Sequence, residues 1–231
     1  MRQPTRPTHL SEFAERSLAA LSAAGLGHVI SLGGALGLLH YLDYRSTHDV
    51  DAWWTQEVLP EDQERVLATV EAALRPFGEV RTRKWGDVIS LELKKDGKTI
   101  FSFQIATRAV QLQPPTTLAW SDVALDSLAD LVASKMVALV ERGAPRDFRD
   151  IYIVCLFDLM TPVDCWKLWR LRQREGGSDA DLHRARLAIE THLTRISQHR
   201  PLSAIADADQ RTEAEALRTW FTQKLLNAQL D

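Results

Sequence analysis

The stretch His28–Trp54, HVISLGGALGLLHYLDYRSTHDVDAWW, decides how the rest of this chain is organised. It predicts a strand over 28–32, the glycine pair Gly33–Gly34, a helix over 35–43, and then a loop into a second strand. A glycine pair ahead of a helix leaves backbone N–H groups open to an anion such as a phosphate chain. The same pair is also common in ordinary tight turns. The first half of the stretch therefore indicates either a phosphate cradle or a simple turn.

The second half of the stretch places Asp49 and Asp51 two residues apart on the second strand. Side chains on a strand alternate between its faces, so the two carboxylates point the same way while Val50 points into the core. Two neighbouring carboxylates repel each other unless a cation lies between them, and Mg²⁺ or Mn²⁺ suits that position. An Asp-x-Asp run also occurs at solvated strand ends. Its place after the glycine pair favours a metal clamp.

The order of these features resembles the first motif of the nucleotidyltransferase superfamily, and within it most resembles the AbiEii family of nucleotidyltransferase toxins. The resemblance is carried by a glycine pair, an apolar helix and an Arg-x-Thr-x-Asp-x-Asp run, which here are Gly33, Gly34, Arg45, Thr47, Asp49 and Asp51. It implies an enzyme that moves a nucleoside monophosphate from an NTP to an acceptor hydroxyl. In that implied site the two aspartates are catalytic metal ligands, and the other four residues bind the nucleotide.

Two alternating runs, 87–94 and 99–105, are joined by KKDGK and predict a β-hairpin. One face of the hairpin is apolar, and the other carries Glu92 and Gln104 together with two serines. AbiEii-like chains tend to have an aspartate where this chain has Gln104, and a glutamine cannot act as a base. Glu92 on the neighbouring strand is then the expected replacement as a third metal ligand.

A helix is predicted over 126–142, with Lys135 close to the middle of its apolar stripe. A lysine in that position should either snorkel to solvent or pair with a negative group. The run SKMVALVERGAPRDFRDIY resembles the second AbiEii signature, through Lys135, Arg142, Arg146, Asp147 and Asp150. The resemblance implies that Lys135 is catalytic and contacts the nucleotide phosphates, that Arg146 assists it, and that the two aspartates complete the catalytic cleft. Without the resemblance, the aspartates are simply acidic residues at a helix N-terminus.

Composition bounds the class of protein. The chain has 231 residues, of which 45% are apolar and 26% charged, with a net charge of -3, as in an ordinary globular protein. With only two cysteines, Cys155 and Cys165, no disulfide framework is expected, and this fits a reducing cytoplasm. The N-terminus lacks a signal-peptide core, and no apolar run reaches membrane-spanning length. A cytoplasmic protein without a membrane segment is expected.

The predicted fold class is α/β (α+β): a nucleotidyltransferase-type mixed sheet domain over 1–115, then an α-helical domain over 116–231 that closes the cleft. The boundary is placed at the proline pair Pro114–Pro115, after which helical periodicity dominates. One later helix carries Trp166 and Trp169 among several basic residues. This helix either meets RNA or buries its tryptophans in the core, and the second interpretation is favoured.

The sequence thus predicts a Mg-dependent nucleotidyltransferase with an NTP substrate. The resemblance further suggests a toxin acting on tRNA, with an antitoxin protein as partner, while a small-molecule acceptor stays open. The alternative function is a nucleotide-binding or partner-binding module whose catalysis is impaired, because Gln104 replaces a carboxylate.

Overall fold

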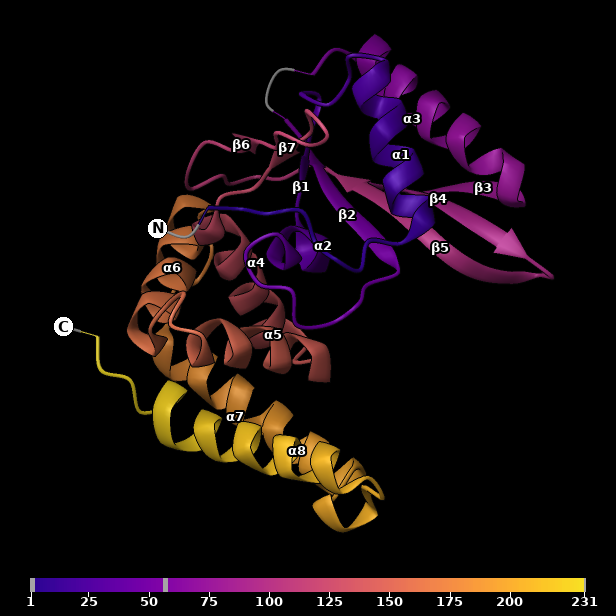
Figure 1. The fold of residues 1–231 in the computed structure, drawn as a ribbon. Helices are drawn as coiled ribbons and strands as arrows, with labels where there is room; N and C mark the ends of the chain where they lie inside the picture. Colours follow the sequence, from indigo (N-terminus) through magenta and orange to yellow (C-terminus); the bar gives the residue numbers. More distant parts are fainter. Residues whose placement is uncertain (1–2, 56–57, 231) are drawn as a thin grey trace. The chain divides into compact units, whose positions relative to one another are not determined.

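The computed structural model describes residues 3–55 and 58–230. The chain divides into two compact units, a sheet unit that ends at Leu131 and a helical unit that begins at Val132 (Figure 1). The division falls inside α4 (Leu128–Glu141). The predicted fold class, a mixed sheet followed by helices, is confirmed. The domain boundary at residue 115 stays a prediction, and two short strands after it still belong to the sheet.

The sheet unit is built on seven strands in the order β3-β4-β5-β2-β1-β7-β6. They are β1 (Ile30–Leu32), β2 (Asp49–Trp54), β3 (Glu79–Trp85), β4 (Val88–Lys95), β5 (Lys98–Ala106), β6 (Thr116–Thr117) and β7 (Ala124–Leu125). β2 runs parallel to β5 and antiparallel to β1, and β1 runs parallel to β7. The sheet is therefore mixed, with β2 near its centre.

The predicted hairpin is confirmed as β4 and β5. Its turn residues Asp96 and Gly97 have φ values of 51° and 74°, which is the backbone that an Asp-Gly hairpin turn requires. The sequence interpretation missed β3, because this edge strand is exposed along most of its length and shows no apolar alternation. Basic side chains on β3, such as Arg81 and Arg83, protect this edge from pairing with another chain.

Helices α1 (Glu12–Ala23) and α3 (Pro60–Leu74) lie side by side against the sheet (Figure 1). Ser11 caps α1, because its side chain accepts a hydrogen bond from the Ala14 N–H. The Phe13 ring lies 5.6 Å from the Phe101 ring of β5, which joins α1 to the apolar face of the hairpin. This face forms the core of the unit and leaves the opposite face for polar residues.

The helix predicted over 35–43 is shorter in the structure, where α2 spans Gly34–Leu39. His40 follows it with a fully buried ring, and its Nδ1 atom lies 2.8 Å from the Leu36 carbonyl oxygen. The ring also stacks on Trp120 at 5.8 Å between centroids. Packing of this ring into the core turns the chain out of the helix.

The helical unit contains most of α4, followed by four further helices. These are α5 (Pro145–Leu156), α6 (Pro162–Glu175), α7 (Leu182–His199) and α8 (Ala208–Trp220), the last of which continues as a π-helical turn over Phe221–Leu225. Trp166 and Trp169 of α6 are buried at 0% and 2% exposure, so the core interpretation of these tryptophans is confirmed. Trp166 Nε1 donates to the Leu225 carbonyl at 2.9 Å and ties α6 to the π-helical turn. Within the described ranges, no helix is both long and apolar enough to cross a membrane.

Candidate active site

β2 presents its two aspartates on one face, as its alternation predicts. Val50 between them is fully buried, whereas Asp49 is exposed and Asp51 is half-buried. The carboxylates therefore lie on the polar face of the sheet, where solvent and ligands have access to them.

The neighbouring strand β5 supports Asp49 through a short hydrogen-bond chain. Ser102 pairs with Asp49 in the parallel register, and its hydroxyl donates to Asp49 Oδ1 at 2.8 Å. Gln104 pairs with Asp51 and donates from Nε2 to the Ser102 oxygen at 3.4 Å. Ser102 was not singled out from the sequence, although the alternation of the hairpin already placed it on the polar face. The Gln104 amide thus supports Asp49 indirectly, through Ser102, instead of adding a third negative charge.

Glu92 does not join the aspartate pair, contrary to the expectation that it replaces a third ligand. It pairs with Ser102 from the far side, on β4, so it lies two strands from Asp49, which is about 10 Å at ordinary strand spacing. Its carboxylate lies instead 3.4 Å from the Arg83 guanidinium and 3.9 Å from the Lys94 ammonium. Two strands of separation and two cationic neighbours hold Glu92 in an ion-pair network.

No group of three or more His, Cys, Asp or Glu residues in the described part of the chain is arranged to hold a metal ion. A divalent cation at Asp49 and Asp51 would therefore take its other ligands from water and from a bound substrate. That donor set, two carboxylates with waters and phosphates, is the one Mg²⁺ commonly accepts in phosphoryl-transfer sites. The residues present fit such a cation.

The glycine pair lets the start of α2 approach β2 closely. Gly34 has a φ of +56°, and a Cβ atom placed on it would lie 2.1 Å from Asp51 Oδ2. A Cβ atom on Gly33 would lie 2.4 Å from Trp53 Nε1. The Gly33 N–H donates to the Asp51 carbonyl at 2.8 Å, so it is already engaged. A phosphate cradle at this turn has to use N–H groups from Gly34 onward.

A buried ion pair beside the glycine pair was not found from the sequence. Asp126 is 1% exposed, and it accepts hydrogen bonds from Arg108 at 2.6 Å and from Ser31 at 2.5 Å. Burial raises the pKa of the Asp126 carboxyl, while the Arg108 charge and the hydrogen bonds from Arg108 and Ser31 oppose that rise. The Arg108 guanidinium also lies 5.7 Å from the Trp53 ring centre. Asp126 follows β7 and Arg108 follows β5, so no sequence motif links the two residues.

Arg45 and Thr47 lie in the loop before β2. The Arg45 guanidinium donates to the Ser46 carbonyl at 3.2 Å and lies 5.7 Å from the Tyr44 ring centre. The Thr47 hydroxyl donates to the Asp49 carbonyl at 3.4 Å. Both residues thus belong to the segment that leads into the aspartate strand.

The second predicted group forms an ion-pair cluster within the helical unit. Lys135 Nζ lies 2.6 Å from Asp150 Oδ2 and 3.9 Å from Asp147 Oδ1, and Arg142 donates two hydrogen bonds to Asp147, at 2.8 and 3.0 Å. Both aspartates are fully buried, and Lys135 is 7% exposed. The lysine in the apolar stripe therefore pairs with carboxylates, which was one of its two expected outcomes. Arg146 is exposed on α5, one residue before Asp147.

Comparison with known proteins places this arrangement in a family. A model of the nucleotidyl transferase AbiEii toxin family, Type IV TA system, matches residues 16–227. The chain belongs to this family.

This AbiEii family member is also similar to solved structures, one of which has a TM-score above 0.5. A putative nucleotidyltransferase from H. pylori has 16% sequence identity and a TM-score of 0.53, with 94% of this chain and 97% of that one covered. ANT(2")-Ia in complex with adenylyl-2"-tobramycin has 16% identity and a TM-score of 0.44, with 71% and 94% covered. No curated protein sequence matches the chain. The H. pylori structure and the family match together identify a nucleotidyltransferase fold.

Proposed function

We propose that this AbiEii family member is a divalent-metal-dependent nucleotidyltransferase that moves a nucleoside monophosphate from an NTP to an acceptor hydroxyl and releases pyrophosphate. The observation that carries the proposal is the geometry of β2. Asp49 and Asp51 share one accessible face, and Gly34 packs directly against the Asp51 side chain. The proposal is supported by this proximity, because two carboxylates beside a glycine turn suit a divalent cation next to a phosphate chain.

The site residues of the sheet unit have distinct roles in the proposed reaction. Bound Mg²⁺ or Mn²⁺, held by Asp49 and Asp51, would neutralise charge on the triphosphate as the bond breaks. Ser102 fixes the orientation of Asp49 through its hydrogen bond. The Gly34 turn, with Arg45 and Thr47 from the loop before β2, would bind the phosphate chain.

In the helical unit we assign the charged residues of the ion-pair cluster to binding and orientation. Asp150 fixes the Lys135 ammonium, and Arg142 fixes Asp147. Lys135 and Arg146 would supply positive charge toward the phosphates, and Asp147 and Asp150 would orient Lys135 and the acceptor. These assignments rest on the family signature and on the mutual distances within the cluster.

Gln104 does not by itself exclude catalysis. Phosphoryl transfer depends mainly on positioning and on electrostatic stabilisation, because its transition state requires little covalent participation by the protein. A glutamine opposite Asp51 still supports Asp49, because it donates to the Ser102 hydroxyl that bonds Asp49. The second candidate function, a nucleotide-binding module with impaired catalysis, is favoured by this same glutamine, since it cannot take the proton of the acceptor hydroxyl.

For the acceptor we propose RNA, with tRNA first, and for the biological role a toxin neutralised by an antitoxin protein. The support is the type of family, a Type IV TA system toxin. A small-molecule hydroxyl is the other acceptor class to be tested.

The test is incubation of the purified chain with Mg²⁺ and each labelled NTP, with total RNA, with small-molecule acceptors, or with none. We expect label on RNA, reduced at least about 10³-fold in Asp49→Asn, because an amide does not replace a carboxylate ligand. Asp87→Asn removes an exposed carboxylate from another loop of the sheet unit and should keep full activity.

Full transfer by Asp49→Asn would remove the metal clamp from the proposal. Metal-dependent NTP binding without transfer to any acceptor would favour the impaired binding module.

A further inference from the structure

A cavity of about 710 Å³ lies within the helical unit. Its walls come from the two residues after α4, the start of α5, the second half of α7, most of α8 and the chain between α7 and α8. This volume lies in the range of small-molecule and cofactor sites, about 300–1,000 Å³. The cavity is large enough for a nucleotide-sized group.

The charge around this cavity is one-sided, although the whole chain carries a net charge of -3. Five arginines and two histidines line it, against one carboxylate, Glu213, among its described lining residues. The basic residues are Arg142, Arg149, Arg195, Arg200 and Arg218, with His192 and His199. Clustering of one sign in a concave surface concentrates the field and attracts a ligand of the opposite sign.

Two of these arginines are neutralised within the unit. Arg142 is bound to Asp147, and Arg149 lies 2.9 Å from the Glu213 carboxylate. Arg195 and Arg200 are exposed, and neither forms an ion pair with a carboxylate in the described parts of the chain. At least two positive charges of the cavity therefore lack a carboxylate counter-ion among the residues that the structure describes.

Part of the cavity lining is apolar. Phe148 and Ile205 line it at 1% and 5% exposure, with Leu217 beside them. The Phe148 ring packs edge-on against Phe221, with 4.7 Å between the ring centroids, and this contact holds the apolar lining in position. A ligand that combines anionic groups with flat apolar surface matches both features, and nucleotides linked through phosphates are such a ligand.

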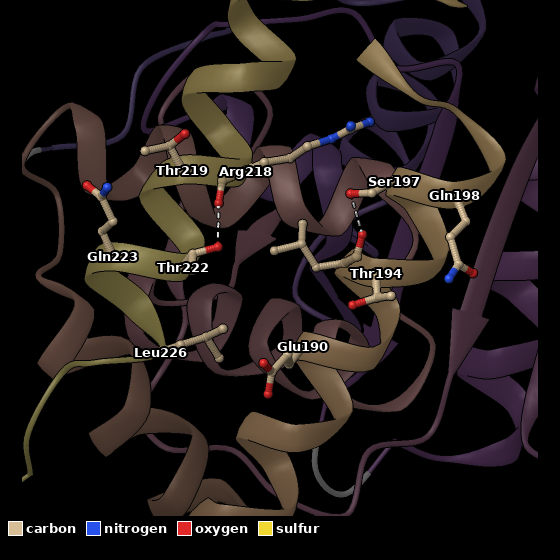
Figure 2. Close-up of a pocket in the computed structure, with 10 residues that line it drawn as sticks. Glu190, Thr194, Ser197, Gln198, Arg218, Thr219, Thr222, Gln223 and Leu226 are labelled. Atoms are coloured by element: carbon tan, nitrogen blue, oxygen red, sulfur yellow. Dashed lines mark hydrogen bonds between the residues drawn. The ribbon is translucent and has the colours of Figure 1, made fainter. Parts of the chain in front are cut away.

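A second cavity in the same unit serves as a comparison, because its lining is not predominantly basic. It has about 600 Å³ and lies between α7 and the end of α8 with the π-helical turn (Figure 2). Its charged lining residues are Glu190 and Arg218, and Arg218 also lines the first cavity, while the others are neutral polar residues and two leucines. Its Ser197 and Thr222 hydroxyls donate to carbonyls of their own helices, at 2.9 and 3.0 Å. The positive charge is therefore particular to the first cavity and is not general to α7 and α8.

The basic cavity borders the ion-pair cluster, because Arg142 lines the cavity and binds Asp147, which in turn lies 3.9 Å from Lys135. We propose that this cavity binds the sugar–phosphate backbone of a nucleic-acid strand, with Arg195 and Arg200 contacting phosphates. Identification of that strand as the acceptor rests on the proposed nucleotidyltransferase function. Binding of the strand does not rest on it.

The test measures binding of a fluorescein-labelled single-stranded 12-mer oligoribonucleotide to the full chain, without NTP or divalent metal, over a series of salt concentrations. The variant Arg195→Gln/Arg200→Gln should raise the Kd about tenfold or more and lower the salt slope by about 1.4, since each phosphate contact on a single strand contributes about 0.7. The matched control Arg174→Gln/Arg184→Gln removes two exposed arginines of α6 and α7 outside the cavity and should bind like the unmodified chain.

Equal affinity in the cavity variant and the unmodified chain would overturn the proposal. So would a chain that binds UMP or pyrophosphate through Arg195 and Arg200 but not the oligonucleotide, because the occupant would then be a small anion. The thermal midpoint of each variant shows that it is folded. Asp49→Asn should retain full oligonucleotide binding, so loss of transfer and loss of strand binding are read separately.

Discussion

Two pairs of aspartates, one in each unit, differ in what surrounds them. Asp49 and Asp51 lie on the polar face of β2, where Asp49 is exposed and is held by a serine hydroxyl. Asp147 and Asp150 lie on α5, are fully buried, and are bound by Arg142 and Lys135. The residue type is the same, but the carboxylates on α5 have cationic partners, whereas Asp49 is held by a neutral hydroxyl.

The difference separates two kinds of function. A buried carboxylate is tolerated only when a cation and hydrogen bonds compensate for its loss of hydration, so the α5 pair already has its positive partners. Asp49 is accessible and held by a neutral hydroxyl, so it retains the capacity to take a cation from solution. We therefore expect metal binding on β2 and structural and orienting roles on α5.

The largest effect on stability is expected from Lys135→Met. This change takes the ammonium from the buried Asp150 carboxylate and should lower the free energy of unfolding by about 3–5 kcal/mol. Urea unfolding measures the loss. Asp49→Asn, at the exposed pair, should change the same quantity by less than about 0.5 kcal/mol.

A double change sharpens this prediction. Lys135→Met combined with Asp150→Asn removes both charges together, so the double variant should be more stable than the sum of the single losses predicts. Simple additivity, or a loss below about 1 kcal/mol for Lys135→Met alone, would contradict a strong buried ion pair.

An intermediate effect is expected from Gly34→Ala, with Gly25→Ala as its control. Both glycines have positive φ values, +56° and +67°, so each alanine carries a similar backbone strain of about 1–2 kcal/mol. Only at Gly34 does the new Cβ collide with the Asp51 side chain, whereas at Gly25 nothing lies within 4 Å. Gly34→Ala should therefore lose at least about 1 kcal/mol more, together with nucleotidyl transfer. Equal losses of stability and unchanged transfer would show that Asp51 does not depend on this contact.

The smallest expected effect is on the pH dependence of stability. It comes from His40, a buried histidine of the sheet unit. Burial lowers the pKa of His40 from its ordinary value of 6.5, although the hydrogen bond with the Leu36 carbonyl partly opposes the shift. The unfolded chain then binds a proton that the folded chain does not, so this contribution to stability is complete above pH 6.5 and is lost as the pH falls through the lowered pKa of the folded chain.

Between about pH 7.5 and pH 5, His40 should reduce the free energy of unfolding by at most about 1.4 kcal/mol per pH unit. Urea unfolding across this range should show a shallower pH dependence in His40→Gln. His28→Gln, at an exposed histidine of the same unit, should leave the slope unchanged. An unchanged slope in His40→Gln would mean that His40 does not titrate differently on folding.

Local pattern was sufficient for much of the sheet unit. Alternation at Asp49–Asp51 predicted the accessible carboxylate pair, and the Asp-Gly turn predicted the β4–β5 hairpin. Local pattern failed at β3, where an exposed edge strand carries no apolar alternation. It also failed at Glu92, because alternation tells which face a residue occupies but not how many strands separate it from Asp49.

The sequence by itself determined the family, the two aspartates of β2, the glycine turn and the lysine within the apolar stripe of α4, because each depends on spacing along a single element. The tertiary structure alone decided that Lys135 pairs with Asp150, that Ser102 supports Asp49, and that Arg108 meets Asp126. It also gathered arginines from α4's end, α5, α7 and α8 around one cavity. These contacts join residues on different elements, and the free energy that selects them comes from burial and charge pairing, which the spacing of residues along one strand or helix does not encode.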